Sequence, residues 1–347
     1  MPTMSSLIKN LRIQNFKSIK DLSLDCERIN VFIGKPNAGK SNILEAVSLL
    51  GVNYPPQNST NLKFGENAIR YKSLNHLFSD FNFRNPIEIS INNHVSAILK
   101  EANEQGYDFV FQVSTLKENP DEVFNYNFPS IQVRLYSNGT IAGSSSEETN
   151  PPSSPIKRYE FAGLIETNKN GHSLRTPQGD NFYSIIESHP ALREEVKRFL
   201  EPNGLQLLLD IENQRITVVQ TTEDTLISFP LVLVPDTFQR YIFHLAAIMS
   251  NRDSVLLFEE PESHSYGPYI YELAQHMLND EGGNQFFLTT HNPYLLLPLM
   301  KEMDDVAIFT TWFENYETHA RRLTEQELQE IADYGIDLFY NIDHFIP

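Results

Sequence analysis

The sequence of 347 residues is poor in cysteine and tryptophan, with one of each, and it has few basic side chains. The single cysteine, Cys26, excludes an internal disulfide framework and a cysteine-rich metal site. No apolar run reaches the roughly 18 uncharged residues that a membrane span requires, and the N-terminus lacks the apolar core of a secretory signal. We therefore expect a globular protein of the cytoplasm that makes no contact with a membrane.

Acidic side chains outnumber basic ones by 45 to 27, which gives a formal net charge of −18. This balance does not support DNA as a partner, because phosphate neutralisation needs an excess of Lys and Arg. Residues 1–80 nevertheless hold 10 Lys/Arg against 6 Asp/Glu. An anion-binding site is therefore expected near the N-terminus.

The hydrophobic pattern at both ends of the chain predicts an α/β fold. In residues 1–84, "INVFI" predicts a buried strand that runs through a glycine-bounded loop into a helix, "KSNILEAVSLL". In residues 231–347, the strands "SVLLFEE" and "QFFLTTH" alternate with helices, and a hairpin and an acidic helix follow. Such alternation predicts a mostly parallel sheet with helices on both faces.

Residues 85–230 have a different pattern and are predicted to form an inserted region of antiparallel strands and one amphipathic helix, "PALREEVKRFL". A Ser/Pro-rich stretch near 138–156 predicts an exposed, mobile loop. This region either docks a partner or covers an edge of the sheet, and the sequence leaves both alternatives open.

The glycine-bounded loop matches the phosphate-binding pattern G-x-x-x-x-G-K-[ST] between a predicted strand and a predicted helix. Its glycines allow successive N–H groups to point at phosphate oxygens, and the helix N-terminus adds its positive end. Lys40 is expected to reach the β- and γ-phosphates of ATP, and the Ser41 hydroxyl to bind Mg²⁺. The predicted nucleotide-binding residues are Gly34, Lys35, Pro36, Asn37, Ala38, Gly39, Lys40, Ser41 and Asn42.

Three carboxylates follow the apolar strand "VLLF" within four residues. A magnesium nucleotide needs an acidic group at the end of a neighbouring strand, and Glu259 occupies that position. Glu260 is the candidate general base for the water that attacks the γ-phosphate. Glu262 and His264 either contact the metal shell, face an opposing subunit or lie in solvent.

His291 ends a second apolar strand, one helix after the acidic strand. An imidazole there is placed to sense the γ-phosphate, and Asn292 and Pro293 are predicted to start the next helix. His291 is therefore the third candidate catalytic residue, with Lys40 and Glu260.

These elements, in this order, resemble the ABC-type ATPase heads of the RecF, SMC and OLD (overcoming-lysogenization-defect) proteins. The opening "IKNLRIQNFKSIKDLSL" is similar to the first strands of that family, and Asn15-Phe16-Lys17-Ser18 matches its N-F-[RK]-S element. The resemblance implies that Lys17 lies near the nucleotide, that Glu259 is the Walker B metal residue, that Glu260 is the catalytic base and that His291 is the switch histidine. It also implies a homodimer or higher oligomer, in which two heads enclose the nucleotides.

The sequence departs from the family in two places. The Walker B residue is Glu259, whereas most members have Asp. The Ser/Gly signature that acts on the partner's nucleotide is replaced by Pro235-Asp236-Thr237-Phe238-Gln239-Arg240. Asp236 is predicted to be the helix N-cap, and the candidate trans-acting residues are Asp236, Thr237 and Arg240. No Q-loop glutamine is evident, and Asn82 and Arg84 lie where one would be sought.

The resemblance implies a Mg²⁺-dependent ATPase of OLD type, and only 56 residues follow His291, too few for the fused nuclease domain of OLD nucleases. The first hypothesis is therefore an oligomeric ATPase that controls a separate effector, a nuclease or toxin, in bacterial defence against phage. A RecF-like ATPase of DNA repair or replication is the second, and a slow nucleotide-binding switch is the third.

Overall fold

The computed structural model describes residues 8–51, 62–66, 68–102, 106–115, 128–146, 153–165, 167, 169–222, 225–302 and 304–347. Residues 1–7 and residues 147–152 of the Ser/Pro-rich stretch therefore lie outside the described residues.

A six-stranded sheet forms the centre of the α/β fold, in the order β16-β15-β3-β14-β13-β9. All neighbours pair in parallel except β15 and β16, which form a hairpin. Its strands are β3 (Ile29–Ile33), β9 (Ile156–Tyr159), β13 (Val255–Glu259), β14 (Gln285–Thr289), β15 (Val306–Glu314) and β16 (Glu317–Arg322). The strands β3 and β14 are buried throughout, as expected for parallel strands covered on both faces.

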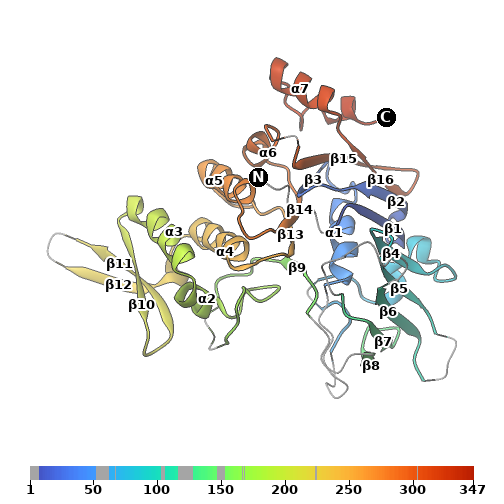
Figure 1. The fold of residues 1–347 in the computed structure, drawn as a ribbon, viewed down its shortest axis with the longest axis horizontal. Coiled ribbons are helices and arrows are strands. Elements are labelled where there is room, and N and C mark those ends of the chain that lie inside the picture. The colour runs from blue at the N-terminus through green and yellow to red at the C-terminus, as the bar shows by residue number, and fades with distance from the viewer. Residues whose placement is uncertain are drawn as a thin grey trace, which may run out of the picture.

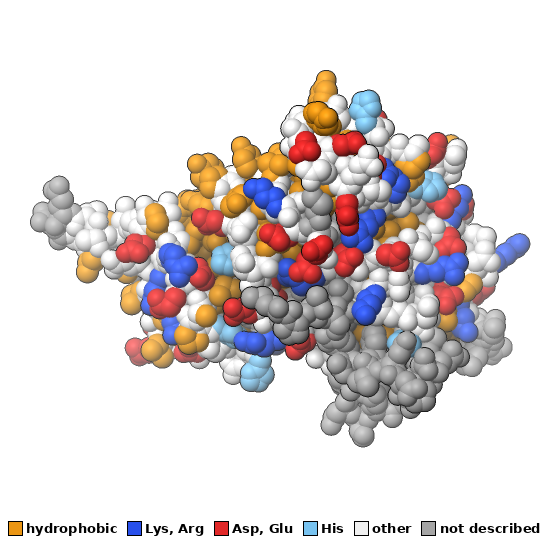
Figure 2. All heavy atoms as spheres, turned by 45° about the horizontal axis from the view of Figure 1, so that its top comes forward, with side chains coloured by type: hydrophobic (Ala, Val, Ile, Leu, Met, Phe, Trp, Pro, Cys, Tyr) orange, Lys and Arg blue, Asp and Glu red, His pale blue; other side chains and the backbone are white. Residues whose placement is uncertain are grey.

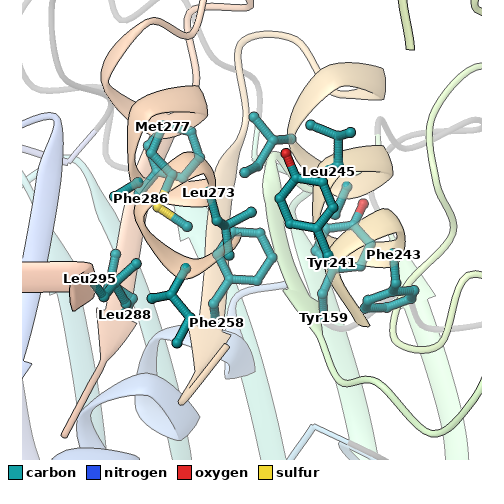
Figure 3. Close-up of a cluster of buried hydrophobic side chains, with 14 of the residues drawn as sticks. Tyr159, Tyr241, Phe243, Leu245, Phe258, Leu273, Met277, Phe286, Leu288 and Leu295 are labelled. Atoms are coloured by element: carbon teal, nitrogen blue, oxygen red, sulfur yellow. The ribbon is translucent and has the colours of Figure 1, made fainter. Parts of the chain in front are cut away.

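Helices cover both faces of this sheet (Figure 1). They are α1 (Lys40–Leu49) on one side and α4 (Asp236–Ser250), α5 (Gly267–Leu278) and α6 (Pro293–Leu299) on the other. Figure 3 shows the second side, where Phe258 and Phe286 from the strands belong to one hydrophobic core with Leu273 and Phe243 from the helices. The predicted α/β fold with a mostly parallel core sheet is confirmed.

A seven-stranded antiparallel sheet lies on the α1 side, in the order β2-β1-β4-β5-β6-β7-β8 (Figure 1). Its strands are β1 (Asn10–Phe16), β2 (Ile19–Asp25), β4 (Ile87–Ile91), β5 (Val95–Glu101), β6 (Phe109–Thr115), β7 (Ile131–Leu135) and β8 (Ile141–Ser146). Strands from before and after residue 85, the predicted start of the inserted region, thus form one sheet. Its buried side chains share one hydrophobic core with α1, so the helix that begins in the P-loop is enclosed between two sheets.

The Ser/Pro-rich stretch differs from its prediction, because Ile141–Ser146 is the edge strand β8 and not a mobile loop. This segment pairs antiparallel with β7, and Ser144 is buried. Serines are tolerated in an edge strand because one face of such a strand can remain exposed to solvent.

The remaining elements are a lobe that packs beside α4 and, separately, a helix near the C-terminus. They are α2 (Phe182–Ser188), α3 (Pro190–Leu200), the antiparallel strands β10 (Leu205–Asp210), β11 (Arg215–Thr221) and β12 (Leu226–Pro230), and α7 (Glu325–Tyr334). Throughout the described ranges, every helix is too short or too polar to cross a membrane.

Candidate nucleotide site

The P-loop joins β3 to α1, and its conformation is set by neighbours as well as by its glycines. Gly39 has φ 91°, a left-handed conformation that favours glycine, and a Cβ there would lie 1.9 Å from Thr318 Oγ1 of β16. The Lys40 ammonium donates to the carbonyl oxygens of Gly34 at 2.9 Å and Lys35 at 3.0 Å. The β15–β16 hairpin therefore supports the loop from outside, while Lys40 closes it from inside.

A pocket of about 450 Å³ opens above this loop. The residues that line it are Pro36, Asn37, Ala38, Gly39, Lys40, Ser41, Asn42, Glu260 and His291. Burial lowers the pKa of Lys40, and the negative charges of Glu260 and Glu259 oppose part of that effect. The pocket thus brings together residues 36–42, Glu260 and His291, whereas the predicted Gly34, Lys35 and Glu259 do not line it.

Glu259 is the last residue of β13, and strand alternation turns it toward the face that α1 covers. Its Oε1 accepts hydrogen bonds from Ser41 Oγ at 2.5 Å and Arg70 Nη2 at 2.7 Å, and its Oε2 accepts from Arg158 Nη2 at 2.5 Å. Burial acts to raise the pKa of Glu259, but the Ser41 hydrogen bond and the charges of Arg158 and Arg70 outweigh it and lower the pKa. Glu259 is therefore ionised at neutral pH.

Glu260 and His291 face each other across the pocket, with 3.6 Å between Oε1 and Nε2. Glu260 has φ 44°, a left-handed conformation that is uncommon for a residue with a side chain and clusters at functional sites. Burial, followed by the charge of Lys40, lowers the pKa of His291, and Glu260 acts in the opposite direction. The His291 imidazole is therefore neutral at pH 7 and can accept a proton.

Glu262 is buried and holds the loop that bears His291. Its Oε1 accepts from Thr290 Oγ1 at 2.6 Å and from the His291 amide at 2.9 Å. Burial raises the pKa of Glu262, and these two hydrogen bonds oppose the rise. Of the alternatives from the sequence, solvent exposure is thus wrong for Glu262, whereas His264 is exposed.

Asn42 and Lys17, both predicted to lie near the nucleotide, differ in whether they line the pocket. Asn42 lines the pocket and donates to Ser18 Oγ at 2.7 Å, so it links α1 to the β1–β2 turn. Lys17 does not line the pocket, because its ammonium pairs with Glu45 on the buried side of α1. Burial lowers the pKa of Lys17, although Glu45 acts to raise it.

The signature-like residues lie at the start of α4, and none of them lines the P-loop pocket. The predicted N-cap is wrong, since Pro235 is the cap and Asp236 is already helical. The Asp236 carboxylate pairs with Arg240 Nε at 2.6 Å, one turn further on, and so does not face the helix amides. Thr237 Oγ1 accepts from the amide of Tyr266 at 3.3 Å, which ties the start of α4 to that of α5.

The Q-loop candidates Asn82 and Arg84 are exposed and do not line the pocket. On the side of β13 away from β14, the parallel neighbour is β9, and Tyr159 lies opposite Phe258, so the residues that follow Tyr159 come next to the acidic strand end. The sequence offered little sign of this, because β9 has only four residues between a Ser/Pro-rich stretch and a loop.

Sequence reasoning also missed three residues around Glu259, namely Glu45, Arg70 and Arg158. One signal was available for Glu45, a charged residue on the apolar stripe of a predicted helix, four residues after Ser41. Nothing in the sequence distinguishes Arg70 or Arg158 from other basic residues.

A P-loop between a strand and a helix, an acidic pair after the second strand and a histidine after the third define this chain as an ABC-type ATPase head of the SMC and RecF superfamily. A family model described as "AAA domain, putative AbiEii toxin, Type IV TA system" matches residues 29–297. The chain belongs to this family, and the matched range includes both the P-loop and His291.

The chain is 24% identical to a protein named ATP/GTP phosphatase from Helicobacter pylori, over 82% of this chain and 85% of that protein. It is 37% identical over 71 residues to a DNA replication and repair protein RecF from a Thermoanaerobacter species, which is 19% of this chain and 20% of that protein. A solved SMC head bound to the C-terminal winged-helix domain of ScpA covers 93% of this chain, with 99% of its own length aligned, a TM-score of 0.50 and 13% identity. This last likeness concerns the fold.

Proposed function

We propose that this ATPase head binds Mg²⁺–ATP in the P-loop pocket and hydrolyses it with Glu260 as the general base. The observation that carries the proposal is that Lys40, Ser41, Glu260 and His291 line one pocket. A magnesium ion fits the oxygen donors present. The Ser41 hydroxyl and the ionised Glu259 carboxylate lie together, with 2.5 Å between Oγ and Oε1, and such hard oxygen donors would hold Mg²⁺. When bound, the ion neutralises charge on the phosphates.

Each residue then has a defined task. Lys40 exchanges its two carbonyl partners for phosphate oxygens, and the loop amides provide the other donors. Glu260 orients the attacking water and accepts its proton. His291, whose amide is fixed by Glu262, lies against Glu260 and responds to the γ-phosphate.

A second copy of the chain is part of the proposal. The pocket lining contains no residue from the start of α4, so Thr237 and Arg240 of one copy are available to act on the nucleotide of another. Two copies related by a two-fold axis would complete two equal sites, as the resemblance to paired heads implies.

The output of the cycle is proposed to be control of a separate effector protein, a nuclease or toxin, in defence against phage. The AbiEii toxin named in the family description supports this role. A solved head of the same fold is bound to a domain of another protein, which supports a protein partner in general. The effector would be recovered as a stoichiometric protein when tagged Glu260→Gln protein is purified from its host in Mg²⁺–ATP.

DNA repair in the manner of RecF is the second candidate, favoured by the 71-residue match. The basic residues of the first strands argue against it, because Arg12 pairs with Asp21 at 2.7 Å and Lys17 pairs with Glu45. On the face drawn in Figure 2, acidic and basic side chains are interspersed among the described residues, without a broad basic area. Recovery of DNA in place of a protein in the same purification would favour this candidate.

Binding and turnover are separated by two variants. Lys40→Ala should lose nucleotide binding, whereas Glu260→Gln should keep binding and lose at least about a hundredfold in turnover. Equilibrium binding of a fluorescent ATP analogue and phosphate release measure the two properties. Wild-type affinity in Lys40→Ala would contradict the P-loop assignment, and undiminished turnover in Glu260→Gln would place the base elsewhere.

A further inference from the structure

A cluster of five charged side chains lies between α1, β9 and β13, and the proposed reaction leaves most of it unexplained. Its two carboxylates, Glu45 and Glu259, are shared among the three cations Lys17, Arg70 and Arg158. Glu45 is only 1% exposed, so its pairing with Lys17 and Arg70 is required to keep a charge at that depth. Arg70 bridges the carboxylates, with Nε 3.0 Å from Glu45 Oε1 and Nη2 2.7 Å from Glu259 Oε1.

The two arginines on Glu259 differ in how firmly they are fixed. Arg158 is on β9 next to β13, has an 8% exposed side chain and donates through Nη1 to the Ala68 carbonyl at 2.9 Å. Arg70 lies within the segment that connects α1 to β4, and its side chain is 68% exposed. Moving Arg158 would leave a buried charge without its partner, whereas the exposed Arg70 can release Glu259 to solvent while its Nε stays on Glu45. Arg70 is therefore the displaceable member of the pair.

Arg70 occupies the side of Glu259 that a metal ion would need. Arg70 Nη2 and Ser41 Oγ both lie within 2.7 Å of the same carboxylate oxygen, Oε1. Ser41 and Glu259 are the two protein ligands proposed for Mg²⁺. A guanidinium and a divalent cation that share one oxygen repel each other, and only one of them can neutralise it.

We propose that Arg70 and Mg²⁺ compete for the Glu259 carboxylate. Arg70 stabilises the site before nucleotide binds, and the metal displaces it when Mg²⁺–ATP enters, while Arg158 stays on Oε2. This inference rests on the proposed function, because it assigns a role at the same metal-nucleotide site. It makes Arg70 a positioning residue that sets how much Mg²⁺ the site requires.

The test is a Mg²⁺ titration of nucleotide binding, read from a fluorescent ATP analogue at a fixed, subsaturating concentration. The Glu260→Gln background removes turnover from the measurement. In that background Arg70→Gln should lower the Mg²⁺ concentration for half-maximal binding by about tenfold, because the competing cation is gone. Binding of Mg²⁺ by free nucleotide is the same for all variants and cancels from the comparison.

Arg198→Gln in the same background is the matched control. Arg198 is also exposed and paired, with Nη1 2.9 Å from Glu195 Oε1, but it lies on α3. A structural role for Arg70 alone would lower the thermal midpoint without moving the Mg²⁺ midpoint. Arg70→Lys keeps the charge but cannot bridge Glu45 and Glu259, so its Mg²⁺ concentration for half-maximal binding should lie between those of wild type and Arg70→Gln. This variant replaces Arg70→Gln in the test if Arg70→Gln does not fold.

An Arg70→Gln midpoint for Mg²⁺ equal to or above that of Arg198→Gln would overturn the inference and leave the proposed function intact. Absence of nucleotide binding in the wild type and the control at every Mg²⁺ concentration would instead remove the proposed function, and this inference with it.

Discussion

Glu259, Glu260 and Glu262 lie within four residues of one another, yet each has a different environment. Glu259 meets Ser41 and two arginines, Glu260 faces the pocket and His291, and Glu262 is buried under the loop that bears His291. The strand end explains this separation, because β13 ends at Glu259 and Glu260 has φ 44°, so the regular alternation of the strand does not continue to Glu262. The proposed metal ligand, the proposed base and the carboxylate that fixes the His291 amide therefore come from one short stretch of sequence.

His291→Ala should slow ATP turnover by at least about tenfold, because an imidazole next to the base takes part in proton transfer or in orienting Glu260. The side chain is 36% exposed, so its removal leaves no cavity and the fold should persist. Phosphate release and thermal unfolding, measured on the same preparation, separate the two effects. A wild-type rate in the variant would assign His291 a structural role only.

Glu262 should make the protein less stable as pH rises. Its native pKa is raised by burial, so the native state binds the proton more tightly than the unfolded chain, and stability falls as pH rises from the ordinary value of about 4.3 through the raised native pKa. Glu262→Gln lacks this titration. Urea titrations at pH 4 to 8 give the unfolding free energy of both proteins. As pH rises, the variant should become more stable relative to wild type. A difference that is constant with pH would contradict this account of Glu262.

At the scale of elements, local periodicity was sufficient to predict the P-loop unit and the strands that end in Glu259 and His291. The β15–β16 hairpin and α7 were also foreseen, because each is encoded in contiguous residues. Pairings between distant segments were not predictable. Strand β9 aligns Arg158 with Leu257, and this register brings the arginine to Glu259, 101 residues further along the chain. A polar edge strand such as β8 has too weak an apolar alternation to be distinguished from a loop.

The contact between the P-loop and the β15–β16 hairpin can be tested at Gly39. Gly39→Ala adds a Cβ that would overlap Thr318, and the hairpin must move away from the loop. We expect nucleotide affinity to fall by at least about tenfold, because the loop amides lose their alignment. The measurement is equilibrium binding of a fluorescent ATP analogue.

Gly335→Ala is the matched control, since Gly335 also has positive φ, 61°, but a Cβ there meets nothing within 4 Å. Both variants should lose about 1 kcal/mol of stability from backbone strain. Equal nucleotide affinity in the two would show that the hairpin contact does not matter for binding.

On the scale of the whole molecule, the pocket draws on the P-loop, the acidic strand end and the histidine of one copy, while the signature-like start of α4 lies outside it. An assembly of two copies is the simplest arrangement that brings both parts to one nucleotide. If the start of α4 acts on the nucleotide, as we propose, the chemistry therefore needs an oligomer.

Mixing two inactive variants tests this requirement. Lys40→Ala removes the P-loop function of its own copy, and Arg240→Ala removes the proposed trans-acting cation. A mixed dimer contains one site with both functions intact, so an equal mixture should recover about one quarter of wild-type turnover if subunits exchange freely. Failure to recover activity in a mixture shown to exchange subunits would place Arg240 in its own copy's site or outside catalysis.

The most direct test of the central claim is the rate of phosphate release from ATP per molecule of wild-type protein, measured across a range of protein concentrations with Mg²⁺. We predict a rate per molecule that rises with concentration to a plateau as copies associate, and no rise above background for Glu260→Gln. No phosphate release at any concentration, or equal release by Glu260→Gln, would contradict ATP hydrolysis at this site, and a rate per molecule independent of concentration would contradict the need for a second copy.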